Sequence, residues 1–510
     1  MDSEIEKISE LLTGPTPQSS PSIWKWLLRF AWILPLLFLL LFPLVFANRG
    51  INNDEALIGQ QIHSLMNKGA VSAEFFRDYP PFDGPIIIYN KLFVWLGAAI
   101  SYALGWGLYQ LRLISVFSGV AILVMLYFFL KSIETRRVAA LACLVLLWSP
   151  VFWDQMTIFR PEMLVTALGF ASFLILWEAD MRRSVPLTAL AGAFAGWSGL
   201  AHPVGLFFMV AGVVALVFER EFRLAVILVV AAFFAFIPYL TGLIIDWRSF
   251  FGQLFDNGVM ASKIYLEWWI PFINLLSEHK RIFRSPSVYG LTVLFILSLF
   301  LIRKVQFREN RFFWNYLIAL FILGAVAPFP KIIRYLLPVT PFFAIAIARV
   351  INSFTLTGAS KNKVFGTLFL FWIGAFIIYG GYALGAAAFG ERTAPREMEA
   401  NRLLAAKMNK GALVIAPFDF VFEQIDNFTI QSWWGCEKAS NDNMTPEFVE
   451  RYALKHGVEY LIVNDIYLKK MKISPDELRQ SFRLYTPIYM LPKRDRYLMG
   501  KIAKALEKAR

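Results

Sequence analysis

The chain has 510 residues, of which 57% are hydrophobic and 16% aromatic, and its formal net charge is +13. Soluble globular proteins contain roughly 45–50% apolar residues, so this composition argues against a soluble protein. Several charge-free runs are long enough to cross a hydrocarbon layer of roughly 30 Å, and they predict a polytopic α-helical membrane protein. Much of the positive charge lies in short connections between these runs, where Lys and Arg orient membrane spans. It is therefore not evidence for nucleic-acid binding.

Residues 1–23 form a polar tail with several Pro and Ser, which we expect to be disordered and cytoplasmic. A transmembrane region follows at 24–389. It begins with Phe30 to Ala47, a charge-free run that we interpret as a retained anchor. We predict about eleven spans in all, the later ones at 111–130, 138–153, 163–180, 186–200, 204–218, 224–245, 287–302, 312–328, 334–351 and 364–386.

The segment 86–104 is apolar enough to span, but it carries Asn90, Lys91 and Ser101 and could equally lie in the interface. Charge decides between these alternatives. If 86–104 lies flat, the short connections that are rich in Lys and Arg all face the cytoplasm; if it spans, the arrangement inverts and violates the positive-inside rule. We therefore expect juxtamembrane helices in an outer loop at 48–110, a cytoplasmic N-terminus and an extracytoplasmic C-terminus.

The composition changes near Gly390, and 390–510 predict a small extracytoplasmic α/β domain. Helical patterns at 395–409 and 446–457 alternate with apolar runs at 411–417 and 458–465 that are typical of buried strands. We interpret the residues after Lys493 as a basic helix on anionic lipid.

Adjacent carboxylates, Asp54 and Glu55, follow the first apolar run. Asn53 can cap a helix there, and acids in the first helical turn favour the positive end of the helix dipole. A helix start would hold a carboxylate in place beside an acceptor hydroxyl, as a general base requires. A capped surface helix without any chemical role is the alternative.

Two further outer segments carry paired charges or cations. Arg160 and Glu162 stand at the mouth of a span, where an Arg opposes the orientation bias and favours anion binding; a local ion pair is the alternative. Lys331 and Arg334 form a second outer basic pair, followed by Tyr335, which we include among the candidates.

Three other candidates rest on weaker patterns. Asp83 lies in a turn rich in Pro and Gly, which by itself indicates only a rigid connection. His202 begins a span after a turn, and a lone histidine is more often structural than chemical. His279 could bind a divalent metal together with Asp54 and Glu162, although the sequence does not show that the three converge.

Four segments together resemble the GT-C fold glycosyltransferases, and most of all the protein mannosyltransferase and aminoarabinose transferase group. They are NNDEALIGQQI, YPPFDGPIIIYNKLFVWLGAAISYALGWGLYQLRLIS, FRPEMLVTALGFASFLILWEA and RYLLPVTPFFAIAIAR. Their order and approximate spacing match, and they cover most of residues 25–390. Each segment alone is loosely defined.

The resemblance implies an inverting transferase that moves a sugar from a polyprenyl phosphate to a hydroxyl of a lipid, glycan or protein acceptor. Asp54 matches the catalytic acid of the family and Glu55 its neighbour. Glu162 stands where the family usually has Asp, and His202 where many relatives have Lys. The pair Glu278-His279 is weakly similar to a metal-contacting histidine.

A polyprenyl phosphate leaving group needs cations, and Arg160, Lys331 and Arg334 are the candidates. No cofactor is required, and a divalent metal remains an open alternative. The short loops favour a bacterial inner membrane. A transporter or flippase is the first rival function, but the predicted spans are nearly free of charge and the charges gather at one mouth. A non-catalytic partner in cell-envelope assembly is the second.

Overall fold

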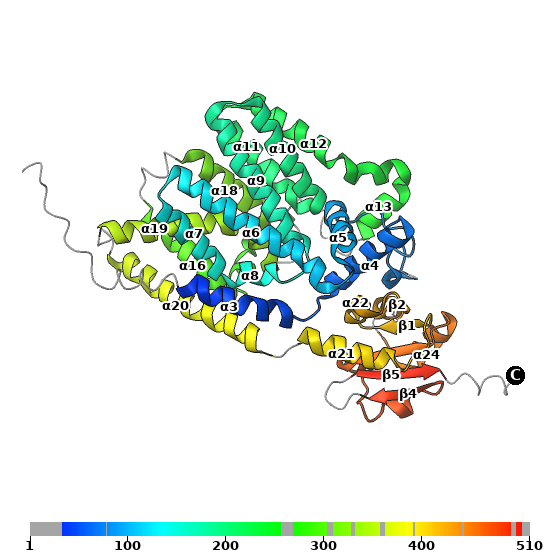
Figure 1. Ribbon diagram of the computed structural model, residues 1–510. Helices are drawn as coiled ribbons and strands as arrows, with labels where there is room; N and C mark the ends of the chain where they lie inside the picture. The colour runs from blue at the N-terminus through cyan, green and yellow to red at the C-terminus, as the bar shows by residue number, and fades with distance from the viewer. Residues whose placement is uncertain are drawn as a thin grey trace, which may run out of the picture.

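Apolar helices make up most of the molecule, and a small sheet with its own helices lies at one end of them (Figure 1). The computed structural model describes residues 33–77, 79–256, 269–302, 310–327, 332–357, 363–390, 393–440, 443–490 and 496–501. The predicted tail at 1–23 and Lys331 lie outside the described residues.

Over the residues that the structure describes, each predicted span overlaps an apolar helix or two consecutive helices. Among these residues, five helical stretches can each cross a membrane by length and composition, and up to eight can if each bent pair of helices counts as one span. The five stretches are α6 (Leu108–Ile133), α9 (Pro161–Arg182), α12 (Phe222–Ile245), η4 with α19 (Ile333–Val339 and Thr340–Thr357) and α20 (Lys363–Phe389).

The bent pairs and the shorter helices account for the other predicted spans. The bent pairs are α3 with α4 (Ile33–Asn48 and Asn53–Lys68), α7 with α8 (Arg136–Trp148 and Pro150–Met156), and α14–α15 with α16 (Ile270–Leu276, His279–Ile282 and Pro286–Leu301). The shorter apolar helices are α5 (Lys91–Leu104), α10 (Val185–Ala201), η2 with α11 (Pro203–Gly205 and Leu206–Phe218) and α18 (Arg311–Val326). Helix α13 (Trp247–Asp256) follows α12, and η1 (Glu74–Phe76) follows α4.

Small residues allow close contact between helices α10 and α12. A Cβ on Gly196 would lie 2.3 Å from the Ala232 carbonyl oxygen, and one on Gly192 would lie 2.5 Å from that of Leu228. Glycines four residues apart on one face let two helix backbones approach, which is a common way to pack helices that share an apolar environment.

Helix α4 begins and ends as its sequence predicts, with one difference at the cap. Asn52, not Asn53, is the capping residue: its side chain accepts a hydrogen bond from the Asp54 backbone N–H, and the Glu55 carboxylate accepts one from the Asn52 N–H. Gly69 ends the helix with a φ of 67°, a left-handed conformation that glycine adopts without strain.

The C-terminal part contains a five-stranded sheet in the order β2-β1-β3-β5-β4. Its strands are β1 (Leu413–Ala416), β2 (Thr429–Ser432), β3 (Tyr460–Asn464), β4 (Tyr485–Met490) and β5 (Arg496–Lys501). Strand β1 pairs in parallel with β2 and β3, and β5 pairs antiparallel with both β3 and β4. Its helices are α21 (Thr393–Ala405), η5 (Phe418–Phe420), α22 (Val421–Gln424), α23 (Trp433–Ala439), α24 (Pro446–Lys455), α25 (Asp465–Met471) and α26 (Leu478–Ser481).

The basic helix predicted after Lys493 is wrong over 496–501. These residues form β5, which pairs with the central strand β3 and buries Tyr497, Leu498 and Met499. Burial of these side chains outweighs the helical tendency suggested by the flanking basic residues.

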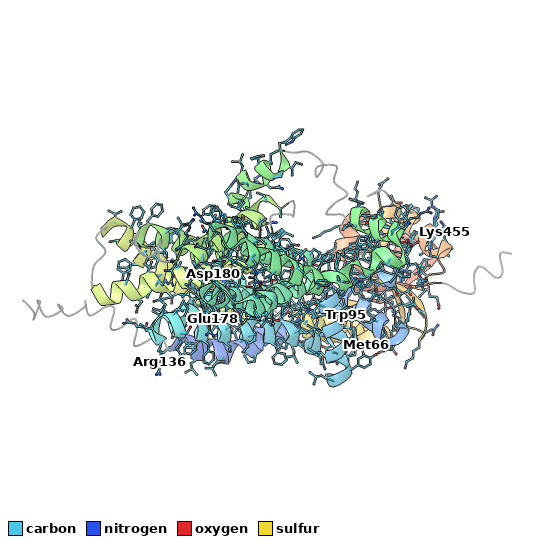
Figure 2. All side chains as sticks on the ribbon, turned by 90° about the horizontal axis from the view of Figure 1, so that it is seen from above. Met66, Trp95, Arg136, Glu178, Asp180 and Lys455 are labelled. Atoms are coloured by element: carbon cyan, nitrogen blue, oxygen red, sulfur yellow. The ribbon has the colours of Figure 1, made fainter. Side chains whose placement is uncertain are left out.

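The C-terminal part packs directly on α4 and the residues after it. Gln60 donates to the Ile430 carbonyl oxygen at 3.0 Å, and Ser432 donates to that of Phe75 at 2.8 Å. Figure 2 labels Met66 of α4 and Lys455 of α24 at one end of the molecule, and Arg136 of α7 at the other. The helix that carries Asp54 is therefore in contact with both parts of the chain.

Candidate active site

A cleft of about 390 Å³ opens beside the start of α4. Helix α8, the residues just before α9, the start of η4 and helix α20 form its walls. The polar residues that line it are Arg49, Asn52, Asp154, Gln155, Arg160, Ser285, Ser287, Arg334 and Tyr379.

Two of the lining residues, Arg160 and Arg334, pair with two acids, Asp54 and Glu162, that lie behind them and do not line the cleft themselves. Arg160 makes a direct ion pair with Asp54 and a second with Glu162, at 2.8 Å between Nη2 and Oε1. Arg334 Nε lies 3.2 Å from the same Glu162 oxygen, and Arg334 Nη1 lies 3.9 Å from Asp54 Oδ2. The structure thus brings together residues from α4, α9 and η4, three segments separated by more than 100 residues each.

The two acids differ in exposure. The Asp54 side chain is 38% exposed, whereas that of Glu162 is 6% exposed. Asp54 is therefore open to solvent beside an arginine of the cleft, and the Glu162 carboxylate pairs with both guanidinium groups. Local geometry supports this arrangement: Arg160 has an extended backbone just before α9, Pro161 starts the helix and Glu162 lies in its first turn.

Glu55 has a different position from Asp54, although the two are adjacent in sequence. It is fully buried against the equally buried Arg112. Oε1 accepts from Arg112 Nε at 2.8 Å and from the Phe159 N–H at 2.7 Å, and Oε2 accepts from Arg112 Nη2 at 2.9 Å. With both oxygens engaged, Glu55 is placed to position the site and not to contact substrate.

Arg112 is the residue that the sequence analysis missed. Its Nη1 donates to the Arg49 carbonyl oxygen at 3.0 Å and its Nη2 to that of Gly50 at 2.8 Å. It therefore ties together the end of the first helix, the start of α4 and, through Glu55, the residue before Arg160. A buried arginine inside an apolar span was the signal that could have revealed it, because such charges are rare without a function.

His202 and Tyr335 lie next to the ion-pair cluster. Their ring centroids are 6.4 Å apart, and His202 Nδ1 accepts from the Val204 N–H at 3.3 Å. The pKa of His202 is lowered to about 4, mainly by burial of the imidazole. The Glu162 carboxylate opposes this shift, and the Arg160 and Arg334 guanidinium groups add to it. The imidazole is therefore neutral at physiological pH.

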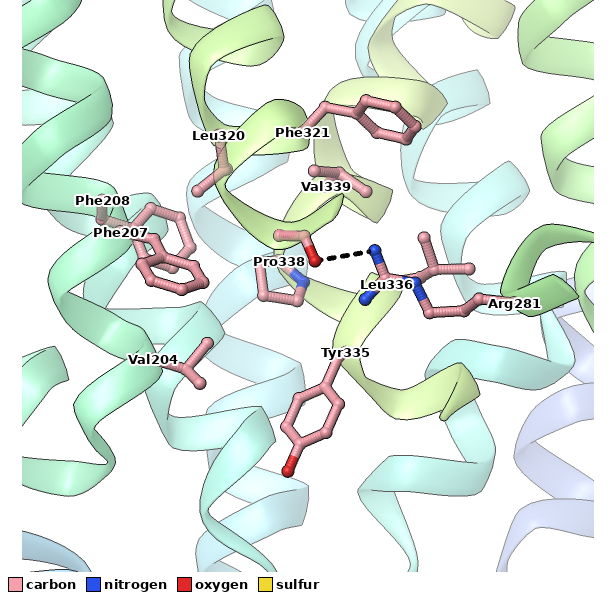
Figure 3. Close-up of a pocket in the computed structure, with 11 residues that line it drawn as sticks. Val204, Phe207, Phe208, Arg281, Leu320, Phe321, Tyr335, Leu336, Pro338 and Val339 are labelled. Atoms are coloured by element: carbon pink, nitrogen blue, oxygen red, sulfur yellow. Dashed lines mark hydrogen bonds between the residues drawn. The ribbon is translucent and has the colours of Figure 1, made fainter. Parts of the chain in front are cut away.

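Tyr335 also lines a second, much smaller cavity of about 20 Å³, with apolar residues and Arg281 (Figure 3). The Arg281 guanidinium donates to the Gly324 carbonyl oxygen at 3.2 Å, and it pairs with Glu278. This cavity is too small for a sugar or lipid headgroup.

Two of the predicted residues join neither the cleft nor the ion-pair cluster. Asp83 is exposed and lines a separate hollow of about 380 Å³ with Glu74 and Arg77. His279 is exposed and its Nδ1 lies 2.8 Å from the Leu276 carbonyl oxygen. Over the described ranges, no three His, Cys, Asp or Glu side chains are grouped so that they could hold a metal ion. The geometry therefore gives no support to the combination of Asp54, Glu162 and His279.

No protein-family profile and no curated protein sequence matches the chain significantly. The structure, in contrast, is similar to solved membrane transferases, and the chain has the GT-C fold expected from its sequence.

One similar structure is ArnT from Cupriavidus metallidurans bound to undecaprenyl phosphate, with 13% sequence identity and a TM-score of 0.61 over 94% of this chain and 98% of that one. Another is the oligosaccharyltransferase from Archaeoglobus fulgidus in complex with Zn and sulfate, with 12% identity and a TM-score of 0.56 over 92% of this chain and 73% of that one. A third is the archaeal oligosaccharyltransferase AglB from Archaeoglobus fulgidus in complex with an inhibitory peptide and a dolichol-phosphate, with 12% identity and a TM-score of 0.53 over 87% of this chain and 70% of that one. At these identities the similarity establishes the fold.

Proposed function

We propose that this protein is an integral membrane glycosyltransferase. It transfers a hexosyl or pentosyl group, with inversion, from a polyprenyl-phosphate donor to an acceptor hydroxyl on the outer face of the membrane. The observation that carries the proposal is the ion-pair cluster of Asp54, Arg160, Glu162 and Arg334, whose two arginines line the cleft. The ArnT and AglB structures with undecaprenyl phosphate and dolichol-phosphate add support from the fold.

In the proposed reaction Asp54 accepts the proton of the acceptor hydroxyl. The hydroxyl oxygen forms a new bond to the anomeric carbon, and the bond from that carbon to the phosphate oxygen breaks. The lipid phosphate leaves with the electron pair, and guanidinium groups stabilise its charge through charge-assisted hydrogen bonds. Arg334 and Arg160 are the described cations for this role; Lys331 stays a prediction.

Donor binding would also prepare the base. Without donor, Asp54 is paired with Arg160, which leaves its oxygens less free to accept a proton. A donor phosphate competes with Asp54 for that guanidinium. Because Glu162 holds Arg160 and Arg334 from the other side, both cations stay in place when Asp54 is released.

The same proposal includes the orientation in the membrane. The N-terminus is cytoplasmic in a bacterial inner membrane, and 390–510 lie outside it and bind the acceptor or cover the site. The end of the molecule that carries α4 and the sheet is then the outer end, and Arg136 lies at the inner end (Figure 2).

Asp54→Asn tests the function because it keeps the size of the side chain and removes the base. We expect turnover of an undecaprenyl-phosphate sugar by the purified protein to fall about 10²–10⁴-fold, the usual contribution of general base catalysis. Glu178→Gln, at the far end of α9, is the control and should keep full turnover. Full turnover by Asp54→Asn would refute the role of Asp54, and uptake of substrate into vesicles without covalent transfer would refute the transferase.

A further inference from the structure

One wall of the cleft carries a second ion pair that the proposed reaction does not use. Arg49 Nη1 lies 2.7 Å from Asp154 Oδ1, and the two side chains are 36% and 30% exposed. Both residues line the cleft. The position of Arg49 is fixed at its backbone, because its carbonyl oxygen accepts from the buried Arg112.

Gln155 extends this pair. Its amide Nε2 donates to Asp154 Oδ2 at 3.2 Å, which directs Oε1 away from the carboxylate. That oxygen is covered and has no hydrogen-bond partner among the described residues. A buried acceptor without a partner is costly, so a ligand that supplies a donor after a small rotation of the amide would be favoured.

The groups on this wall match a sugar hydroxyl, which both donates and accepts. A hydroxyl can donate to Gln155 Oε1 and accept from one of the guanidinium N–H groups of Arg49 that do not face Asp154. Tyr379 and the hydrogen-bonded pair of Ser285 and Ser287 also line the cleft with hydroxyl groups. Hydroxyl-rich ligands are therefore better suited to this wall than apolar ones.

The charges narrow the class of sugar. The Asp154 carboxylate is paired with Arg49 and also accepts from the Gln155 amide, so a protonated amino group would meet no unbalanced negative charge here. The positive charge of Arg49 is balanced by the Asp154 carboxylate in the same way, so this pair offers no excess positive charge to the carboxylate of a uronic acid. Burying an additional charge beside a completed pair would be unfavourable.

We propose that Arg49, Asp154 and Gln155 form the sugar-recognition subsite of the cleft and that the subsite selects a neutral, hydroxylated sugar. This inference rests on the proposed function, since it assumes a glycosylated lipid-phosphate donor.

Binding to the purified full-length protein tests the subsite with three probes. They are undecaprenyl phosphate, undecaprenyl-phosphate glucose and undecaprenyl-phosphate 4-amino-4-deoxyarabinose. We expect Gln155→Ala and Arg49→Lys each to weaken binding of the glucose lipid by about 10-fold, as loss of one or two hydrogen bonds implies. Binding of the lipid without sugar should change less than about twofold. Glu178→Gln is the matched control and should bind all three probes as the wild type does.

Three results would overturn the proposal. Equal weakening for all probes would show that these residues act on the phosphate or on the fold, and unchanged glucose-lipid binding in both variants would show that they do not contact the sugar. Tighter binding of the amino-sugar lipid than of the glucose lipid by the wild type would show that the class of sugar is wrong. Failure of the wild type to bind any of the three lipids would instead refute the proposed function itself.

Discussion

The buried pair of Glu55 and Arg112 allows a quantitative test of how the site is held. Both side chains are fully buried, and Arg112 also donates to three backbone carbonyl oxygens, those of Phe46, Arg49 and Gly50. Arg112→Met keeps much of the side-chain volume but leaves the Glu55 carboxylate as an unpaired buried charge. Removal of one partner of a buried ion pair typically costs about 3–5 kcal/mol. We expect a loss of stability of that size.

A double-mutant cycle separates the pair from its surroundings. Glu55→Gln with Arg112→Met leaves neither charge unpaired, so the double variant should lose less than the sum of the single variants, by about 1–3 kcal/mol. Unfolding of the purified protein in one detergent, followed by tryptophan fluorescence, measures both quantities.

The exposed pair of Glu178 and Arg182 provides the matched control. Their side chains are 47% and 69% exposed, and removal of such a pair costs about 0–1 kcal/mol. If Arg112→Met destabilises the protein no more than Arg182→Met does, the reasoning about the buried pair is wrong.

Three further predictions concern other parts of the chain. Arg334→Lys keeps the charge but loses the planar guanidinium that reaches both Glu162 and Asp54, so we expect turnover in the undecaprenyl-phosphate sugar assay to fall about 10-fold or more with stability nearly unchanged. His202 has a folded-state pKa of about 4, below the value of about 6.5 in the unfolded chain. The unfolded state therefore takes up a proton first as the pH falls, and stability should decrease between about pH 6.5 and pH 4 by an amount that His202→Gln removes. Gly196→Val would place a side chain against the Ala232 carbonyl oxygen, and we expect it to cost about 1–3 kcal/mol or more by unfolding.

Each of these three has an outcome that would contradict it. Wild-type turnover by Arg334→Lys would contradict the first prediction. If the unfolding midpoint of His202→Gln changes with pH as much as that of the wild type, the second prediction is wrong. For Gly196→Val the contradicting outcome is an unfolding midpoint equal to that of Gly374→Val, because a Cβ on Gly374 meets no atom within 4 Å.

The sequence predicted the helices and two of the five described strands because those features depend on local patterns. Apolar length placed the spans, the Asn-Asp-Glu start and Gly69 defined α4, and apolar runs located β1 and β3. Strand β5 was missed since its burial depends on pairing with β3, which lies more than 30 residues earlier.

The site was predictable only in part for a similar reason. Asp54, Arg160, Glu162 and Arg334 each follow or precede a span, so one rule of orientation places them all on one face. Their pairing, however, is a tertiary property. Asp83 lies in a turn and His279 in the four-residue helix α15, both too short for a periodic pattern, and the Arg112 and Arg49 pairs join segments 50 to 110 residues apart.

Contact between α4 and the sheet region also affects how the chain can be divided for experiments. Phe422 packs against Gly59 and stacks on Trp106, and Phe418 lies edge-on to Phe75. A fragment that starts at α21 would expose these rings to water and would be prone to self-association. A water-soluble version of the C-terminal part therefore needs a graft of α4 and η1, or polar replacements at Phe418 and Phe422.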